Sequence, residues 1–263
     1  MPGCQWQVSV SIVRTYIDSE SKFRGLATLA VLTCAALFLP AAAQAADEPT
    51  DEITTVQRAD GRIDQFTTDT APAPQNGSVV LHRSQPAPGA PYGPWEQLGE
   101  NKTPGRNRVI VPIENADGRL EVFWHSQGTV LTASQVTKDG AWTPAAGFGL
   151  GPAPWHGSVI ASAEKDGRFI TFAVDSSGNN VQWREQDGPS GTWQDVEELT
   201  GPEDASTGIQ QPKVTTLPDG GLQLTVFKWS FPATEGSSYY RITQQGPFGP
   251  WGTWEHCSTV RCA

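Results

Sequence analysis

The sequence lacks any persistent helical pattern. No apolar stripe with a 3.6-residue period continues through any stretch, and 27 glycines and 21 prolines are scattered along the 263 residues. Because glycine and proline interrupt helices, this composition argues against a helical fold class. Short runs rich in Val, Ile, Phe and Thr instead alternate with turn residues, as in 108–113 and 119–123. The sequence therefore predicts an all-β protein.

Groups that would hold a metal or serve as a nucleophile are also scarce. The four histidines are scattered without zinc-ligand spacing, no Gly-x-Ser-x-Gly elbow is present, and 175–178 misses the sialidase Asp-box pattern. We therefore expect no metal, no cofactor and no catalytic residues. Two of the four cysteines, Cys257 and Cys262, lie close together near the end of the chain. In an exported protein we expect them to form a small disulfide loop.

The N-terminal 45 residues resemble a leader rather than a folded segment. Lys22 and Arg24 precede an apolar run at 25–39, and a small-x-small site, Ala43-Gln44-Ala45, follows. These features predict a secretory signal peptide with a long n-region, although an uncleaved anchor is the alternative. We expect a secreted, extracellular domain over 46–263, with no membrane insertion after cleavage. The net charge of −10 argues against nucleic acid as a partner.

Three motifs recur four times in the same order. The first is an Asp-Gly turn, at 60, 117, 166 and 219, which we interpret as a two-residue hairpin with a structural aspartate. The second is a strand that ends in glutamine, at 85, 135, 186 and 244. The third is a Gly-x-Trp-like turn, which aligns Trp95, Trp142, Trp193 and Trp254. The glutamine-to-tryptophan spacing is longer in the first and fourth copies, which suggests loop insertions there.

Repeated units of four short strands predict a β-propeller. We expect four blades of four antiparallel strands, with repeats near 60–107, 108–158, 159–211 and 212–263. A strand at 53–58 precedes the first turn, and its pairing with the last blade would close the ring and remove exposed edges. We expect a monomer or a small homo-oligomer.

The units resemble the PLL-like β-propeller repeats of bacteria, which are related to fucose-binding and tectonin-like lectins. The stretches that carry the resemblance are 116–123, 81–85 with 93–99, and 241–254. The resemblance implies sugar sites in grooves between neighbouring blades, lined by tryptophan and polar side chains. It implies a secreted carbohydrate-binding protein without catalysis, with glycans as partners.

Tryptophan supplies most of the candidate ligand-binding residues, because its ring can stack on the C–H face of a sugar. The best constellation is Trp183-Arg184-Glu185, which combines a stacking face, a donor and an acceptor. The other candidates are Trp95, Trp124, Trp142, Trp155, Trp193 and Trp251. Two alternatives to a lectin stay open. One is a protein-interaction or structural module with variable loops. The other is a propeller-type glycoside hydrolase, which needs two carboxyl groups about 5–10 Å apart.

Overall fold

The computed structural model describes residues 52–70, 78–98, 109–126, 128–151, 159–202, 208–228 and 238–257. These residues form four sheets of four antiparallel strands, each built from consecutive strands, and we call them blades 1 to 4. The expected all-β propeller with four blades is confirmed. The described residues contain no helix that could span a membrane. The leader predicted at 1–45 lies outside the described residues.

The strands of the first two blades are short and regular. Blade 1 comprises β1 (Thr54–Gln57), β2 (Ile63–Thr70), β3 (Ser78–Ser84) and β4 (Glu96–Gln97). Blade 2 comprises β5 (Ile110–Glu114), β6 (Leu120–Ser126), β7 (Thr129–Ser134) and β8 (Ala146–Gly147).

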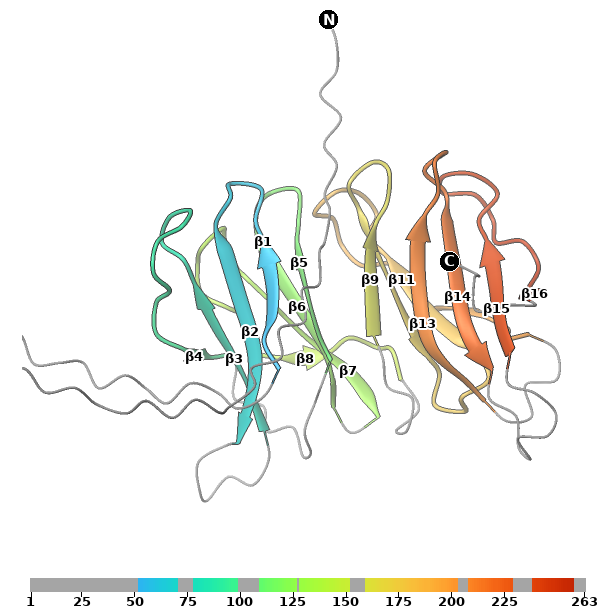
Figure 1. The fold of residues 1–263 in the computed structure, drawn as a ribbon, viewed down its shortest axis with the longest axis horizontal. Helices are drawn as coiled ribbons and strands as arrows, with labels where there is room; N and C mark the ends of the chain where they lie inside the picture. Colours follow the sequence, from blue (N-terminus) through green and yellow to red (C-terminus); the bar gives the residue numbers. More distant parts are fainter. Residues whose placement is uncertain are drawn as a thin grey trace, which may run out of the picture.

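The last two blades repeat the same plan. Blade 3 comprises β9 (Val159–Ala163), β10 (Phe169–Val174), β11 (Val181–Glu185) and β12 (Glu197–Leu199). Blade 4 comprises β13 (Ile209–Thr216), β14 (Leu222–Lys228), β15 (Ser238–Thr243) and β16 (Glu255–Cys257). The first strands of the four blades lie toward the middle of the molecule, whereas β4 and β16 lie at its outer edges (Figure 1).

Closure by strand exchange, which the sequence suggested, does not occur in the structure. The N-terminal strand β1 pairs with β2 in its own sheet, and among the described residues the last sheet consists of β13 to β16. The Asp-Gly turn joins the first and second strands of one blade, so β1 belongs to blade 1. Each blade is therefore complete within its own segment of chain.

The Asp-Gly turn is a three-residue loop rather than the two-residue turn expected. The backbone N–H of Gly61 donates to Arg58 O, the N–H of Arg58 donates to Arg62 O, and Gly61 has φ +86°. A type I turn followed by a left-handed glycine gives this geometry, and only the glycine needs positive φ. In each blade the aspartate Oδ1 accepts from the backbone N–H two residues on, at 2.9–3.1 Å. The structural role expected for these aspartates is confirmed.

The structure aligns the repeated tryptophans differently from the sequence prediction. Isolated β-bridges join Gln135 to Trp142, Gln186 to Trp193, and Gln244 to Trp251, always at a separation of seven residues. The same separation from Gln85 reaches Tyr92. Trp95 and Trp254 therefore occupy a different repeat position, which Ala145 and Val196 fill in blades 2 and 3.

The turn between these columns supports the new alignment. Four residues after the glutamine, each blade has a residue in the left-handed region: Gly89, Asp139, Ser190 and Phe248. Because this conformation is rare outside glycine, its recurrence at one repeat position fixes the register. The first and fourth units carry no insertion between the glutamine and this aromatic column.

Three hydrophobic clusters hold the blades together. They lie between blades 1 and 2, between blades 2 and 3, and between blades 3 and 4. Phe66, Phe123 and Phe172 take equivalent positions in the first three blades, and each is 0% exposed. Burial of such a side chain contributes about 1.5–3 kcal/mol. None of the three clusters joins blade 4 to blade 1.

Candidate functional site at the seam between blades 1 and 4

The face that each blade turns to the next follows a shared pattern. In blades 1 to 3 a buried phenylalanine on the second strand meets an aromatic ring of the following blade. The centroid distances are 6.1 Å for Phe66–Trp142, 5.6 Å for Phe123–Trp193 and 5.7 Å for Phe172–Trp251. At the equivalent place in blade 4, five residues after the turn glycine, stands a threonine, Thr225.

Blade 4 has polar residues at all three side-by-side positions of β13, β14 and β15 in the row that contains Thr225. Lys213 on β13 and Arg241 on β15 lie on either side of Thr225 in the sheet register. Cross-strand neighbours point to the same face of a sheet, so all three side chains face away from blade 3. In blade 2 the same row reads Val111, Phe123 and Thr132. Lys213 is exposed, and Arg241 is half-buried in an ion pair with Glu255 at 2.8 Å.

The opposite face of blade 4 shows the usual apolar character. Leu222, Leu224 and Val226, which alternate with the polar residues along β14, are each 0% exposed and belong to the core shared with blade 3. Alternation along the strand thus gives blade 4 one buried apolar face and one face of mixed polar and aromatic side chains.

Blade 1 is also polar on the face that points away from blade 2. Gln65 and Arg83 are cross-strand neighbours there, and Arg83 Nε donates to Gln65 Oε1 at 2.8 Å. The Arg83 guanidinium lies over the rings of Tyr92 at 4.8 Å and Trp95 at 4.2 Å. All four side chains are half-buried. The positions equivalent to Gln65 in the other blades are fully buried: Val122, Thr171 and Leu224.

We call these two faces the seam. At the other junctions the first strands of neighbouring blades contact each other (β1 with β5, β5 with β9, β9 with β13), whereas no comparable strand contact joins blade 4 to blade 1 among the described strands. Its polar and aromatic side chains include Gln65, Arg83, Tyr92 and Trp95 on blade 1, and Lys213, Gln223, Thr225, Phe227, Tyr239, Arg241 and Glu255 on blade 4. Hydrogen bonds between side chains or from side chain to backbone join neighbouring blades at each of the other three junctions. Aromatic rings beside guanidinium, ammonium and amide groups can stack on a sugar ring and bond its hydroxyls.

A second polar cluster lies between blades 3 and 4. Arg168 contacts Glu185 through Nη1 at 2.6 Å and Glu164 through Nε at 3.4 Å. Burial, reinforced by the charge of Glu185, raises the pKa of Glu164 to about 7. Burial also raises the pKa of Glu185, against the opposing effect of Arg168. Phe248, which is 44% exposed, covers the Arg168 guanidinium at 4.1 Å.

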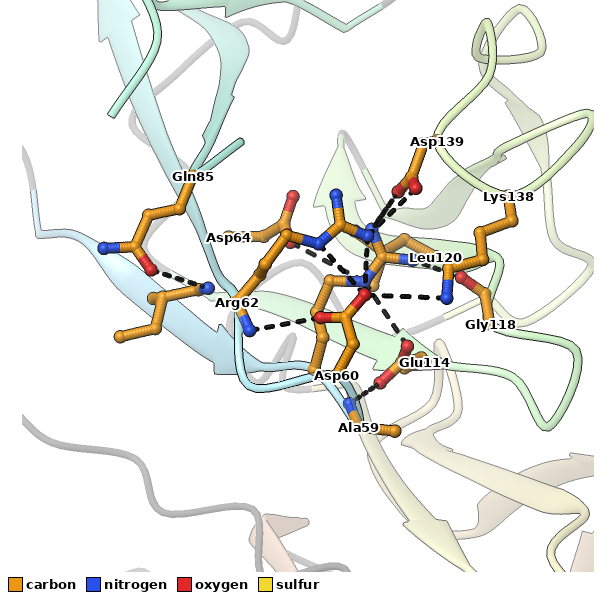
Figure 2. A network of polar contacts seen from close by, with 12 residues as sticks. Ala59, Asp60, Arg62, Asp64, Gln85, Glu114, Gly118, Leu120, Lys138 and Asp139 are labelled. Atoms are coloured by element: carbon orange, nitrogen blue, oxygen red, sulfur yellow. Dashed lines mark hydrogen bonds and ion pairs between the residues drawn. The ribbon is translucent and has the colours of Figure 1, made fainter. Parts of the chain in front are cut away.

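A third cluster, between blades 1 and 2, is a structural network (Figure 2). Arg58 is 3% exposed, and its guanidinium contacts Glu114 and Asp139 of blade 2, as well as the carbonyl oxygen of Gly118. Within blade 1, Asp64 lies 3.8 Å from the Arg58 Nε. These contacts satisfy the guanidinium from several sides and tie the two blades together.

The neighbouring contacts reinforce this network. A hydrogen bond from Arg62 holds the pKa of Asp60 well below its usual range, and Arg62 also bonds Asp139 at 2.9 Å. On the adjacent strand of blade 1, His82 forms a hydrogen bond with Asp64 at 2.6 Å and packs edge-on to Trp142 of blade 2. Because each carboxylate is held by arginine or histidine, the network is suited to holding blades rather than to chemistry.

The constellation Trp183-Arg184-Glu185 is divided between the two faces of β11. Trp183 packs against the core between blades 3 and 4, and Glu185 joins the Arg168 cluster on the same side. Arg184 points to the other face, where it donates to the backbone oxygens of Phe148, Trp193 and Gln194. The three residues therefore do not form one site.

Most of the other candidate tryptophans pack between blades. Trp124 is 1% exposed in the core, while Trp142, Trp193 and Trp251 lie between neighbouring blades. Trp193 Nε1 donates to both carboxylate oxygens of Glu121, at 3.1 and 3.2 Å. Trp155 lies outside the described residues. Only Trp95 belongs to the seam.

Sequence reasoning missed Tyr92, Arg83, Lys213 and Arg241. The available signal was the loss of the repeated phenylalanine at Thr225, but it becomes visible only after the columns are aligned by the bridges. Cys257 is disulfide-bonded, and its expected partner, Cys262, lies outside the described residues. Within the described part of the chain, no group of three or more His, Cys, Asp or Glu side chains could hold a metal ion.

Comparisons with known proteins reveal a shared fold. No family model and no curated protein matches the sequence. An α-L-arabinanase of Penicillium chrysogenum, solved with arabinobiose, superposes with a TM-score of 0.52 at 15% identity, over 78% of this chain and 66% of that one. An ulvan lyase bound to an oligosaccharide gives 0.50 at 12% identity, over 78% of this chain and 57% of that one. A protein of unknown function from Dyadobacter fermentans gives 0.51 at 11% identity, over 79% and 68%.

These findings correct the family resemblance drawn from the motifs. The two neighbours of known activity are an arabinanase and a polysaccharide lyase rather than PLL-like lectins, so that assignment is wrong. The physical reason lies in the motifs themselves. Asp-Gly-Arg and Gly-x-Trp build the hairpin turns that any four-stranded blade needs, so they report the fold and not the family. The chain spans about two thirds or less of the arabinanase and the lyase.

Proposed function

We propose that the protein binds polysaccharide chains at the seam between blades 1 and 4. The observation that carries this proposal is the change of both sheet faces from apolar to polar and aromatic at this one junction. A face meant only for packing gains nothing from Lys213 and Arg241, because burial of unpaired charge is costly. A face meant for sugars needs such donors beside aromatic rings.

The structural neighbours support a carbohydrate ligand. The arabinanase was solved with arabinobiose and the lyase with an oligosaccharide. Likeness at this level of identity concerns the fold alone, so the seam residues carry the argument. The propeller would hold the two faces in a fixed relation, which lowers the entropic cost of binding.

The test is a binding screen of residues 46–263 against arabinan, galactan, cellulose and xylan oligosaccharides and a panel of acidic glycans, with calorimetry on each hit. Trp95→Ala should weaken binding at least about tenfold, since one stacked aromatic contributes roughly 1–3 kcal/mol. Trp254→Ala is the matched control, because Trp254 takes the same repeat position in blade 4 and bonds Thr200 O instead. Equal effects of the two changes, or no binding by a folded sample, would contradict the proposal.

A second candidate function is glycoside hydrolysis by the Glu164–Glu185 pair. The activities of the neighbours fit this alternative better than the non-catalytic lectin that the sequence first favoured. Both carboxyl groups contact one guanidinium, so they lie closer than the upper limit of about 9.5 Å for a glycosidase pair. A pKa of about 7 would let Glu164 donate a proton while Glu185 stays ionised beside Arg168.

Release of reducing sugar from the same glycans tests this candidate. Hydrolysis should fall at least about a hundredfold in both Glu164→Gln and Glu185→Gln, as expected for loss of general acid or base. Glu197→Gln, at an exposed carboxylate of the neighbouring strand, is the control. Binding without any release of sugar would reject hydrolysis and leave the binding function intact.

Export of the protein is also a proposal, based on the leader pattern in residues 1–45. N-terminal sequencing of the protein from the culture medium should find a start after Ala45. A start at Met1 in a membrane fraction would contradict export and support the anchor.

A further inference from the structure

The seam carries a local charge opposite to that of the whole chain. The net charge is −10, with 28 acidic side chains against 18 basic ones. Among the seam strand residues whose side chains are described, three are cationic, Arg83, Lys213 and Arg241, and one is a carboxylate, Glu255. We infer that the glycan bound there is an anionic polysaccharide that carries carboxylate or sulfate groups, an inference that rests on the proposed function.

Lys213 is the most telling of these cations. It lies at the row position that Thr54, Val111 and Ile160 occupy in the other blades. It is exposed, and it makes no ion pair with any described residue. A lysine on the first strand of a blade, with no described carboxylate paired to it, is available to a ligand anion.

Arg241 adds a second cation to the same row. In its ion pair with Glu255, the Arg241 side chain is 42% exposed and the Glu255 side chain is 61% exposed. An exposed pair of this kind contributes at most about 1 kcal/mol, so a ligand carboxylate or sulfate can replace Glu255 at small cost. The planar guanidinium also suits two parallel hydrogen bonds to either anion.

Arg83 supplies the third cation, on blade 1. Its guanidinium lies over the rings of Tyr92 and Trp95 and donates to Gln65, so its position is constrained before any ligand arrives. Aromatic rings next to a fixed guanidinium offer a sugar ring and its anionic substituent adjacent partners. A neutral sugar can offer hydroxyl groups to these donors, but it brings no negative charge to pair with Lys213.

The rest of the surface opposes such a ligand, which makes the seam the expected place of binding. A chain of net charge −10 repels a polyanion over distances of about 8–10 Å at physiological salt. Attraction therefore has to come from a local cationic surface. Within the seam, cations exceed described carboxylates, so the local field has the sign that a polyanion needs.

The experiment compares glycans that differ only in charge. Oligogalacturonate is measured against its methyl ester, and dextran sulfate against dextran, by calorimetry at 50 and 300 mM NaCl. At 50 mM NaCl, the charged member of at least one pair should bind about tenfold more tightly than its neutral member. Because one pair carries carboxylates and the other sulfates, the two pairs distinguish recognition of these anions. Lys213→Gln should reduce that affinity about threefold, as loss of one exposed ion pair does.

Lys165→Gln is the control, because Lys165 is exposed on the turn of blade 3 and its loss changes net charge equally. Equal binding of charged and neutral members, or equal effects of the two lysine changes, would overturn the inference alone. In that case Trp95-dependent binding of a neutral glycan would keep the proposed function. If a folded sample bound none of these glycans and none of the earlier panel, the proposed function itself would fail.

Discussion

Lys213 lies directly opposite Thr225 in the β13–β14 pair, on the face of blade 4 that points away from blade 3. In blade 2 the matching pair is Val111 and Phe123, and the phenylalanine is fully buried. Replacing an apolar pair with lysine and threonine removes the basis for a dry core there, since an unpaired ammonium resists burial. Three hydrophobic junctions therefore join the four blades, and no hydrophobic cluster of the described residues links blade 4 to blade 1.

The first prediction compares the loss of stability at one repeat position, which Tyr92 occupies at the seam and Trp142 occupies between blades 1 and 2. Tyr92→Ala at the seam should lower the free energy of unfolding by less than about 1 kcal/mol, because no core cluster includes Tyr92. Trp142→Ala should cost about 3–5 kcal/mol, because Trp142 packs on Phe66 and His82 between blades 1 and 2. Urea denaturation of both variants measures the difference. Similar losses would mean that the seam is packed like the other junctions.

The fold could be predicted from the sequence because its signals are local and repeated. Asp-Gly turns and short Val- and Ile-rich runs each specify a hairpin, and four copies in order specify four sheets. Strand register was harder to predict, because tryptophan stands at two nearby positions. Trp95 and Trp254 were aligned with Trp142 although Tyr92 and Trp251 are its true equivalents. Residue type cannot decide between such neighbours, whereas backbone hydrogen bonds can.

The site was less predictable, because a strand sends alternate side chains to opposite sheets. Arg184 and Glu185 are adjacent in sequence, yet they contact blade 2 and blade 3 residues on different faces. The contacts of Arg58 join residues 56 and 81 positions apart, and no local pattern encodes that pairing. The replacement of the repeated phenylalanine by Thr225 is the one site signal present in the sequence. It can be recognised only when the repeats are aligned as the structure aligns them.

Arg58 gives a second prediction, about the junction of blades 1 and 2. Arg58→Met should lower the free energy of unfolding by about 3–5 kcal/mol, because it leaves Asp64 and Glu114 without their shared cation. Arg119→Gln is the control, since its ion pair with Asp117 is partly exposed and should contribute less than about 1 kcal/mol. Thermal and urea denaturation measure both. A loss for Arg58→Met no larger than for the control would show that the network does not hold the blades.

The third prediction concerns the hydrogen bond between Trp193 and Glu121. Trp193→Phe keeps most of the ring but removes the donor to a buried carboxylate, so it should cost about 1.5–3 kcal/mol. It should also raise further the pKa of Glu121, which burial already raises. Trp142→Phe, at the same repeat position without a described hydrogen bond from its ring, should cost less. The reverse order in denaturation experiments would reject the role assigned to the indole N–H.

Glu164 gives the last prediction, a dependence of stability on pH. Its pKa is raised from 4.5 to about 7 in the folded protein, so the folded state holds its proton more tightly than the unfolded chain does. The stability that this proton provides is therefore complete below about pH 4.5 and is lost as the pH rises through 7. The upper limit of the loss is about 3 kcal/mol, since one pKa unit corresponds to about 1.4 kcal/mol.

Glu164→Gln should remove this component of the pH dependence, because a side chain that is always neutral needs no proton at that place. Its side chain is 2% exposed, and one carboxylate oxygen has no hydrogen-bond partner in the structure, so ionisation there is unfavourable at high pH. Urea denaturation between pH 4.5 and 8 should therefore find the variant more stable than the parent at pH 8, with the gap closing toward pH 4.5. Glu197→Gln, at an exposed carboxylate, should follow the parent curve. A stability difference between variant and parent that is constant with pH would show that the pKa of Glu164 is not raised. Glu164 could then not serve as the protonated acid of the proposed Glu164–Glu185 pair.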